Sequence, residues 1–371
     1  MKRAIVAVWM AGTILLSGCS ALLNREYSYV VPHNMTPTAA EGDPSILRAE
    51  NYQELVNALI YFVSQGMETG SVRLYSDWED VEADLDAACL EVDQEDPLGA
   101  YAVEYIKYSV ASVVTYYEAD IQITYRRTKE QVASIVSATG TTAIRNELES
   151  ALANFSTEQV LRISYFNEDE DYIHTLCQEA FCANPATALD MPDVEVAIYP
   201  DSGQQRIVEI LLSYHLEPQE LERRHTTLLQ TADHLVQALG PVTGDEAILA
   251  AAKTVLAQGG YLPTGGSTAY HALLEGGADS QGLALAQALL CQELGIPCQV
   301  VPGKLNGEPY FWTVVSTQSG WRHLDVTHMD PVQSSFLVDE QMEAAGFTWD
   351  TASVPRCRQA AQTASGSTTS P

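Results

Sequence analysis

One stretch near the C-terminus constrains the fold most, because it predicts a helix followed directly by antiparallel strands. Apolar residues at helical spacing (Leu283, Ala286, Leu290 and Leu294) predict a helix over Gln281–Leu294. Gly295 and Pro297 are typical of a helix end. The strands expected next are Cys298–Leu305, Tyr310–Thr317 and Trp321–Thr327, joined by hairpin turns at Asn306-Gly307 and Ser319-Gly320.

Three polar side chains stand at the ends of these elements. Ser280 opens the helix two residues before a glycine, Tyr310 lies two residues before a tryptophan, and Asp325 precedes the threonine of an Asp-Val-Thr sequence. This order and spacing resemble the transglutaminase-like (papain-type) superfamily, whose members carry Cys, His and Asp at the three positions. Later segments, Ser335–Met342 and Phe347–Asp350, resemble those of exported bacterial members, so that the resemblance covers Leu221–Asp350.

The resemblance implies an α+β domain in which a helix carrying the nucleophile packs on an antiparallel sheet carrying the base and its orienting acid. In such enzymes the thiolate attacks and the imidazole moves the proton. Ser280 supplies only a hydroxyl, and Tyr310 is neutral at pH 7 because a tyrosine pKa is about 10. We therefore expect a catalytically degenerate domain that acts as a binding or scaffold module at the cell surface, with no assigned catalytic residue. Ser280, with Asp279, would cap the helix, and Tyr310 would donate its hydroxyl to Asp325 or Ser280.

Two other hypotheses remain open. Ser280 could serve a peptide amidase, hydrolase or acyl-transfer enzyme if a relocated base, such as His271, reached it. Alternatively the whole chain could be a structural spacer. Candidate residues for the residual cleft are Trp312, Trp321, His323 and His328; the two tryptophans also suit a core.

The first half of the chain shows an internal duplication at an offset of 89 residues. Arg73 has a counterpart in Arg162, and Tyr125 has one in Tyr214. Each copy is predicted to run α-β-α-β-β, with helices at Tyr52–Gln65 and Thr142–Phe155 opening the two units. Such units could form a binding platform. A spacer is equally compatible with the sequence.

The N-terminus resembles a bacterial lipoprotein signal. Lys2 and Arg3 precede an apolar run that ends in Leu16-Ser17-Gly18-Cys19. That ending resembles a lipobox, which implies cleavage before Cys19 and lipidation of its thiol. We expect an extracytoplasmic protein held at the cell membrane by this lipid, with its bulk in water.

The net charge limits the classes of partner that the chain could bind. The formal net charge is −30, which disfavours nucleic acid and leaves peptide, protein or cell-wall material as candidates. The remaining cysteines show no metal-ligand spacing, so neither a metal nor a cofactor is predicted. Their disulfide pairing cannot be deduced; they are Cys89, Cys177, Cys182, Cys291, Cys298 and Cys357.

These interpretations give a predicted domain order. It comprises a signal peptide (1–18), a tether (19–43), the duplicated region (44–220, divided at about 131/132), a transglutaminase-like domain (221–353) and a disordered tail (354–371).

Overall fold

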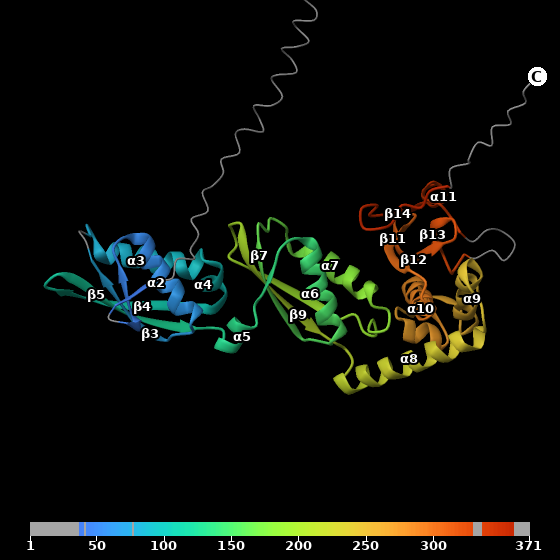
Figure 1. Ribbon diagram of the computed structural model, residues 1–371, viewed down its shortest axis with the longest axis horizontal. Coiled ribbons are helices and arrows are strands. Elements are labelled where there is room, and N and C mark those ends of the chain that lie inside the picture. The colour runs from blue at the N-terminus through green and yellow to red at the C-terminus, as the bar shows by residue number, and fades with distance from the viewer. Residues whose placement is uncertain (1–36, 41, 76–77, 329–335, 360–371) are drawn as a thin grey trace, which may run out of the picture. The chain divides into compact units, whose positions relative to one another are not determined.

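The computed structural model describes residues 37–40, 42–75, 78–328 and 336–359 (Figure 1). The predicted signal peptide, Cys19 and most of the predicted tether lie outside the described residues. The chain divides into two compact units, Met1–Phe62 with Thr69–Cys89 and Lys107–Gln122, and Val63–Glu68 with Leu90–Ile106 and Ile123–Pro371. Helices and largely antiparallel sheets occur throughout, which confirms the α+β class. Within the described ranges, no helix is both long and apolar enough to cross a membrane.

The first sheet has the strand order β1-β2-β3-β5-β4. Its strands are β1 Thr38–Ala40, β2 Asp43–Ala49, β3 Thr69–Leu74, β4 Val103–Val113 and β5 Tyr116–Tyr125, with helices α2 Tyr52–Ser64, α3 Val81–Gln94 and α4 Pro97–Ala102 in the same stretch of chain. Phe62 of α2 packs on Gly70 of β3, where any larger residue would clash with the Phe62 ring. Strand β1 occupies residues that we predicted to be an irregular tether.

The second sheet has the order β6-β7-β9-β8. Its elements are α5 Lys129–Ala133, β6 Val136–Ala138, α6 Thr141–Ala153, β7 Glu158–Ser164, α7 Glu170–Ala183, β8 Asp193–Tyr199 and β9 Gln205–Ser213. Helices α6 and α7 pack together and against β7 and β8. Their apolar residues join one face of the sheet in a shared core.

Apart from β1, the two sheets repeat one another in strand order and in register. In each, a first strand runs parallel to a second, which pairs antiparallel with the last strand of the unit. Observed pairs that differ by 89 residues are Leu47–Val72 with Val136–Leu161, and Arg73–Glu118 with Arg162–Ile207. Each repeat of the duplicated region therefore includes a strand, β2 or β6, before its first helix. The expected α-β-α-β-β order lacked this strand.

The C-terminal part places one helix against a four-stranded antiparallel sheet of order β13-β12-β11-β14. Its elements are α8 Pro218–Leu239, α9 Gly244–Ala257, β10 Tyr261–Gly266, the π-helical turn η1 His271–Glu275, α10 Ser280–Glu293, β11 Cys298–Leu305, β12 Glu308–Thr317, β13 Gly320–Leu324, α11 Asp339–Ala344 and β14 Phe347–Trp349. Helix α10 contacts β11 and β12 as well as α8 and α9 (Figure 1). Every residue of α10 from Ser280 to Cys291 is buried, whereas the sequence predicted one buried face only.

The segment after β14 belongs to this core. Val354 and Cys357 are buried in the cluster that contains Trp312 and Met342. The Cys357 N–H donates to the Asp339 carboxylate at 3.0 Å, and the Asp339 N–H donates to the Cys357 carbonyl at 2.9 Å. The predicted disordered tail therefore cannot begin at residue 354; residues 360–371 lie outside the described part of the chain.

Truncation tests this contribution. A chain that ends at Ser353 should lose about 3 kcal/mol of unfolding free energy relative to one that ends at Gln359, because it loses two buried side chains and the Asp339 hydrogen bonds. Urea unfolding of the two chains measures the difference. Equal stabilities would mean that the segment contributes nothing to the core.

Candidate functional site

Ser280 lies at the start of α10, as predicted, but it does not cap the helix. The capping residue is Asp279, whose side chain accepts a hydrogen bond from the Gly282 N–H at 2.9 Å. The Ser280 side chain is almost fully buried, and its hydroxyl oxygen accepts the N–H of Phe311 on β12 at 3.2 Å. The serine is thus fixed against the backbone of the strand that carries Tyr310.

Gly282 explains how the helix start fits beneath the preceding loop. A Cβ at this position would lie 2.7 Å from the Gly266 carbonyl oxygen and 2.9 Å from that of Thr268. These backbone atoms cannot move aside as a flexible side chain could, so the close approach requires glycine. The loop that contains Gly266 and Thr268 is therefore packed closely against the Ser280 end of α10.

Tyr310 and Asp325 come together; of the two partners expected for the Tyr310 hydroxyl, Asp325 and Ser280, the structure shows Asp325. The Tyr310 hydroxyl lies 3.3 and 3.2 Å from the two Asp325 carboxylate oxygens and also contacts the Thr327 hydroxyl. The Phe347 ring meets the Tyr310 ring edge-on. Burial, and next the Asp325 charge, raise the Tyr310 pKa above its ordinary value, so the phenol stays protonated at neutral pH.

His328, one of the predicted cleft residues, supplies an imidazole to Asp325. Its Nδ1 atom lies 2.7 Å from the Asp325 Oδ2 atom and 3.2 Å from the Tyr310 hydroxyl. We predicted that Asp325 would lie within a strand, but β13 ends one residue before it. The chain therefore turns after Asp325 and brings His328 back toward the carboxylate. The ring is 63% exposed, which leaves it open to solvent.

The hydrogen bonds of the described residues do not join Ser280 to any imidazole. Tyr310 belongs to the cluster of Trp312 and Val314, whereas Phe311 packs in the cluster that contains α10. Successive side chains of a strand point to opposite faces. Tyr310 and the α10 helix therefore lie on opposite faces of β12. His271 bonds to the Thr268 hydroxyl at 2.6 Å and lies 3.5 Å from Glu275.

Two of the predicted cleft residues are core residues instead. Trp312 and His323 are buried, and the indole N–H donates to His323 Nδ1 at 2.9 Å. Trp321 is partly buried and packs against the same cluster. His328 is the cleft candidate that remains beside Tyr310 and Asp325.

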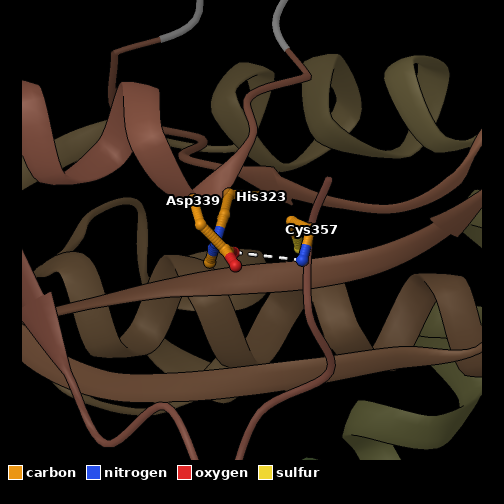
Figure 2. Close-up of side chains that lie close together, drawn as sticks. All are labelled: His323, Asp339 and Cys357. Carbon is orange, nitrogen blue, oxygen red and sulfur yellow. Dashed lines mark hydrogen bonds and ion pairs between the residues drawn. The ribbon is translucent and has the colours of Figure 1, made fainter. Parts of the chain in front are cut away.

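His323, Asp339 and Cys357 form the group best placed to hold a metal ion among the described residues (Figure 2). Their possible ligand atoms lie within 4.8 Å of one another. However, an indole N–H can only donate, so Nδ1 of His323 must carry its lone pair and Nε2 the proton. That proton points to Asp339 Oδ1 at 3.0 Å. A metal at Nε2 would displace it and leave both ring nitrogens without a proton, so the donor set fits a hydrogen-bond chain better than a metal site.

Cys177, Cys182, Cys291, Cys298 and Cys357 carry free thiols in the structure. Cys89, Cys177 and Cys291 are buried. Burial raises the pKa of Cys177, Cys182 and Cys357 to about 12, which keeps these thiols protonated. None of the three has the character of a reactive nucleophile.

Matches of this chain to known proteins are found among solved structures only. No family model matches it, and no curated protein matches it. Among solved structures, a transglutaminase aligns with 64% of this chain and 68% of its own length at 12% identity, with a TM-score of 0.27. A candidate cysteine protease from Cytophaga hutchinsonii aligns with 39% of this chain and 65% of its own at 12% identity and a TM-score of 0.25.

A third structure, a candidate protease from Parabacteroides distasonis, covers 69% of this chain and 39% of its own length at 9% identity, with a TM-score of 0.22. TM-scores this far below 0.5 do not establish a common fold.

His323 predicts a pH dependence of stability. Burial lowers its pKa in the folded protein, and the hydrogen bond to Asp339 opposes only part of that effect. The folded state then binds fewer protons than the unfolded state, so stability is full above about pH 6.5 and is lost as the pH falls toward the folded pKa. Between pH 7.5 and pH 5.0, the free energy of unfolding in urea should fall less in His323→Gln than in the unaltered chain.

His328→Gln is the matched control. Because the His328 ring is exposed, this substitution should not change how much the free energy of unfolding falls between pH 7.5 and pH 5.0. An equal loss in His323→Gln would assign the pH dependence to other groups.

Proposed function

We propose that the protein is a membrane-anchored lipoprotein whose transglutaminase-like C-terminal domain binds a partner without catalysing a reaction. The observation that carries this proposal is the Tyr310 hydroxyl bound to Asp325, at the position where the resemblance expects a base bound to its orienting acid. A phenol whose pKa is raised can donate a hydrogen bond there, but it cannot accept a proton from Ser280 near pH 7.

The surroundings of Ser280 support the same proposal. Its oxygen already accepts the Phe311 N–H, and the group is nearly buried, so it has a structural partner and little access to a substrate. Loss of triad members lowers the rate of well-studied hydrolases by roughly 10⁴ to 10⁶. The ligand classes we favour for the binding role are peptide, protein or cell-wall material.

The alternative is a hydrolase or amidase that uses Ser280 and a relocated base. One observation favours it, namely the 2.7 Å contact between His328 and Asp325, which would leave Nε2 of the ring free to take a proton. The same residue decides between the hypotheses, because only the hydrolase requires the imidazole.

Activity assays provide the test. The soluble part of the chain, from Ser20 onward, should show the same background amine incorporation and peptide amide hydrolysis as Ser280→Ala and His328→Asn. The double variant Ser280→Cys/Tyr310→His shows whether the scaffold accepts a thiol and an imidazole. Turnover in the unaltered protein that falls by 100-fold or more in Ser280→Ala, on the order expected for a nucleophile, would overturn the proposal.

Anchoring has its own test. Cells that express the full chain should incorporate labelled palmitate into the protein, and Cys19→Ala should abolish both the label and sedimentation with membranes. The lipid chains provide the membrane affinity, so their removal should release the chain. Ser17→Ala is a control at the same boundary that leaves the thiol in place. A label that persists in Cys19→Ala would refute lipidation at this residue.

A further inference from the structure

The end of helix α10 turns the chain back and brings Cys298 toward Cys291. Gly295 has a φ of 70°, in the left-handed region that favours glycine. Its N–H donates to the Gln292 carbonyl at 2.9 Å, and the N–H of Ile296 donates to the Cys291 carbonyl at 2.8 Å. These two hydrogen bonds close the helix and reverse the chain just before β11 begins at Cys298.

The side chain of Cys298 lies on the face of the sheet that packs on α10. Cys298 pairs with Val315 of β12, and Val315 belongs to the core cluster that contains Cys291. Directly opposite residues of an antiparallel pair share one face of the sheet, so Cys298 points toward α10 and packs against the same cluster. The Pro297 carbonyl accepts the Ser316 N–H at 2.9 Å, which fixes the start of β11 on β12.

The two thiols meet inside this core. The Cys298 thiol shares a hydrogen bond with the Cys291 thiol, and the Gln287 amide donates to the Cys291 Sγ atom at 3.2 Å. Cys291 is fully buried, whereas Cys298 is partly exposed and lines a cavity of about 360 Å³ together with Cys182. One sulfur of the pair is therefore reached from the cavity, and the other lies behind it.

We propose that Cys291 and Cys298 are a modification site, at which a disulfide oxidant joins them in a bond that ties the end of α10 to the start of β11. The Cys298 sulfur attacks one sulfur of the oxidant RSSR and releases one RSH. The Cys291 sulfur then attacks Cys298 in the mixed disulfide and releases the second RSH. The two thiols thus lose two electrons to RSSR, and their two protons leave on the two RSH molecules.

The surroundings of the thiols suit a structural disulfide. Burial, and next the hydrogen bond with Cys291, raise the pKa of Cys298, so oxidation is slow at neutral pH and becomes faster as the pH rises. The disulfide itself carries neither charge nor proton and has no such desolvation cost. An exported chain meets disulfide oxidants. That setting rests on the proposed function, whereas the contact between the two thiols does not.

Peptide mapping of the oxidised protein tests the proposal. The full chain, purified in non-ionic detergent, is treated with oxidised glutathione at pH 8.5, and the remaining thiols are then alkylated. Protease cleavage after Glu293 separates the two cysteines. Without reductant, the fragments that carry Cys291 and Cys298 should stay joined, unalkylated and lighter by two hydrogens than the reduced pair. The melting temperature should rise by about 5 °C, because the bond constrains the unfolded chain.

Cys182→Ala is the matched control, because this thiol lines the same cavity and its loss should leave both the link and the rise in melting temperature intact. Cys298→Ala should abolish both. Cys291→Ala should stop at the mixed disulfide of Cys298 with glutathione, which an intact-mass measurement detects even in a less stable variant. A link from Cys298 to Cys182, or full alkylation of Cys291 and Cys298 after oxidation of the unaltered protein, would overturn the proposal.

Discussion

The burial of α10 on every side is the constraint on which the C-terminal part of the molecule depends. Strands β11 and β12 cover one side and helices α8 and α9 another, so that even Gln287 is enclosed and donates to the Ile248 carbonyl at 3.2 Å. A helix held in this way cannot shift without disturbing both layers. Its first residue, Ser280, therefore has one position, against the Phe311 backbone, and cannot move toward a distant base.

Asp325 is the centre of the hydrogen bonds at this end of the sheet. The carboxylate accepts from the Thr327 N–H at 2.9 Å and lies within hydrogen-bond distance of the Tyr310 hydroxyl and His328 Nδ1. All of these groups belong to β12 or to the turn after β13. The acid thus organises a small polar surface at the end of the sheet, and the serine on α10 is satisfied separately.

Periodicity and turn chemistry could be read from the sequence, because both act over a few residues. The helix beginning near Ser280 and the hairpin at Asn306-Gly307, where both residues have positive φ, follow from such local rules. The pairing of His328 with Asp325 could not be foreseen, since it depends on where a strand ends. The buried role of Cys357 was equally hidden, because its partner Asp339 lies 18 residues away and gives no periodic signal.

The first and second sheets share a topology but differ in whether one of their faces is exposed. In the first, Ser71 donates to Asp120 at 2.7 Å and the Asp120 side chain is exposed, so that this face is polar and open. The residues at the corresponding positions of the second sheet are Val160 and Glu209, and both are buried. Helix α4 contacts β8 and β9 and so covers this face of the second sheet. A binding platform built from the duplicated region would therefore have to use the first sheet, because α4 already covers the equivalent face of the second.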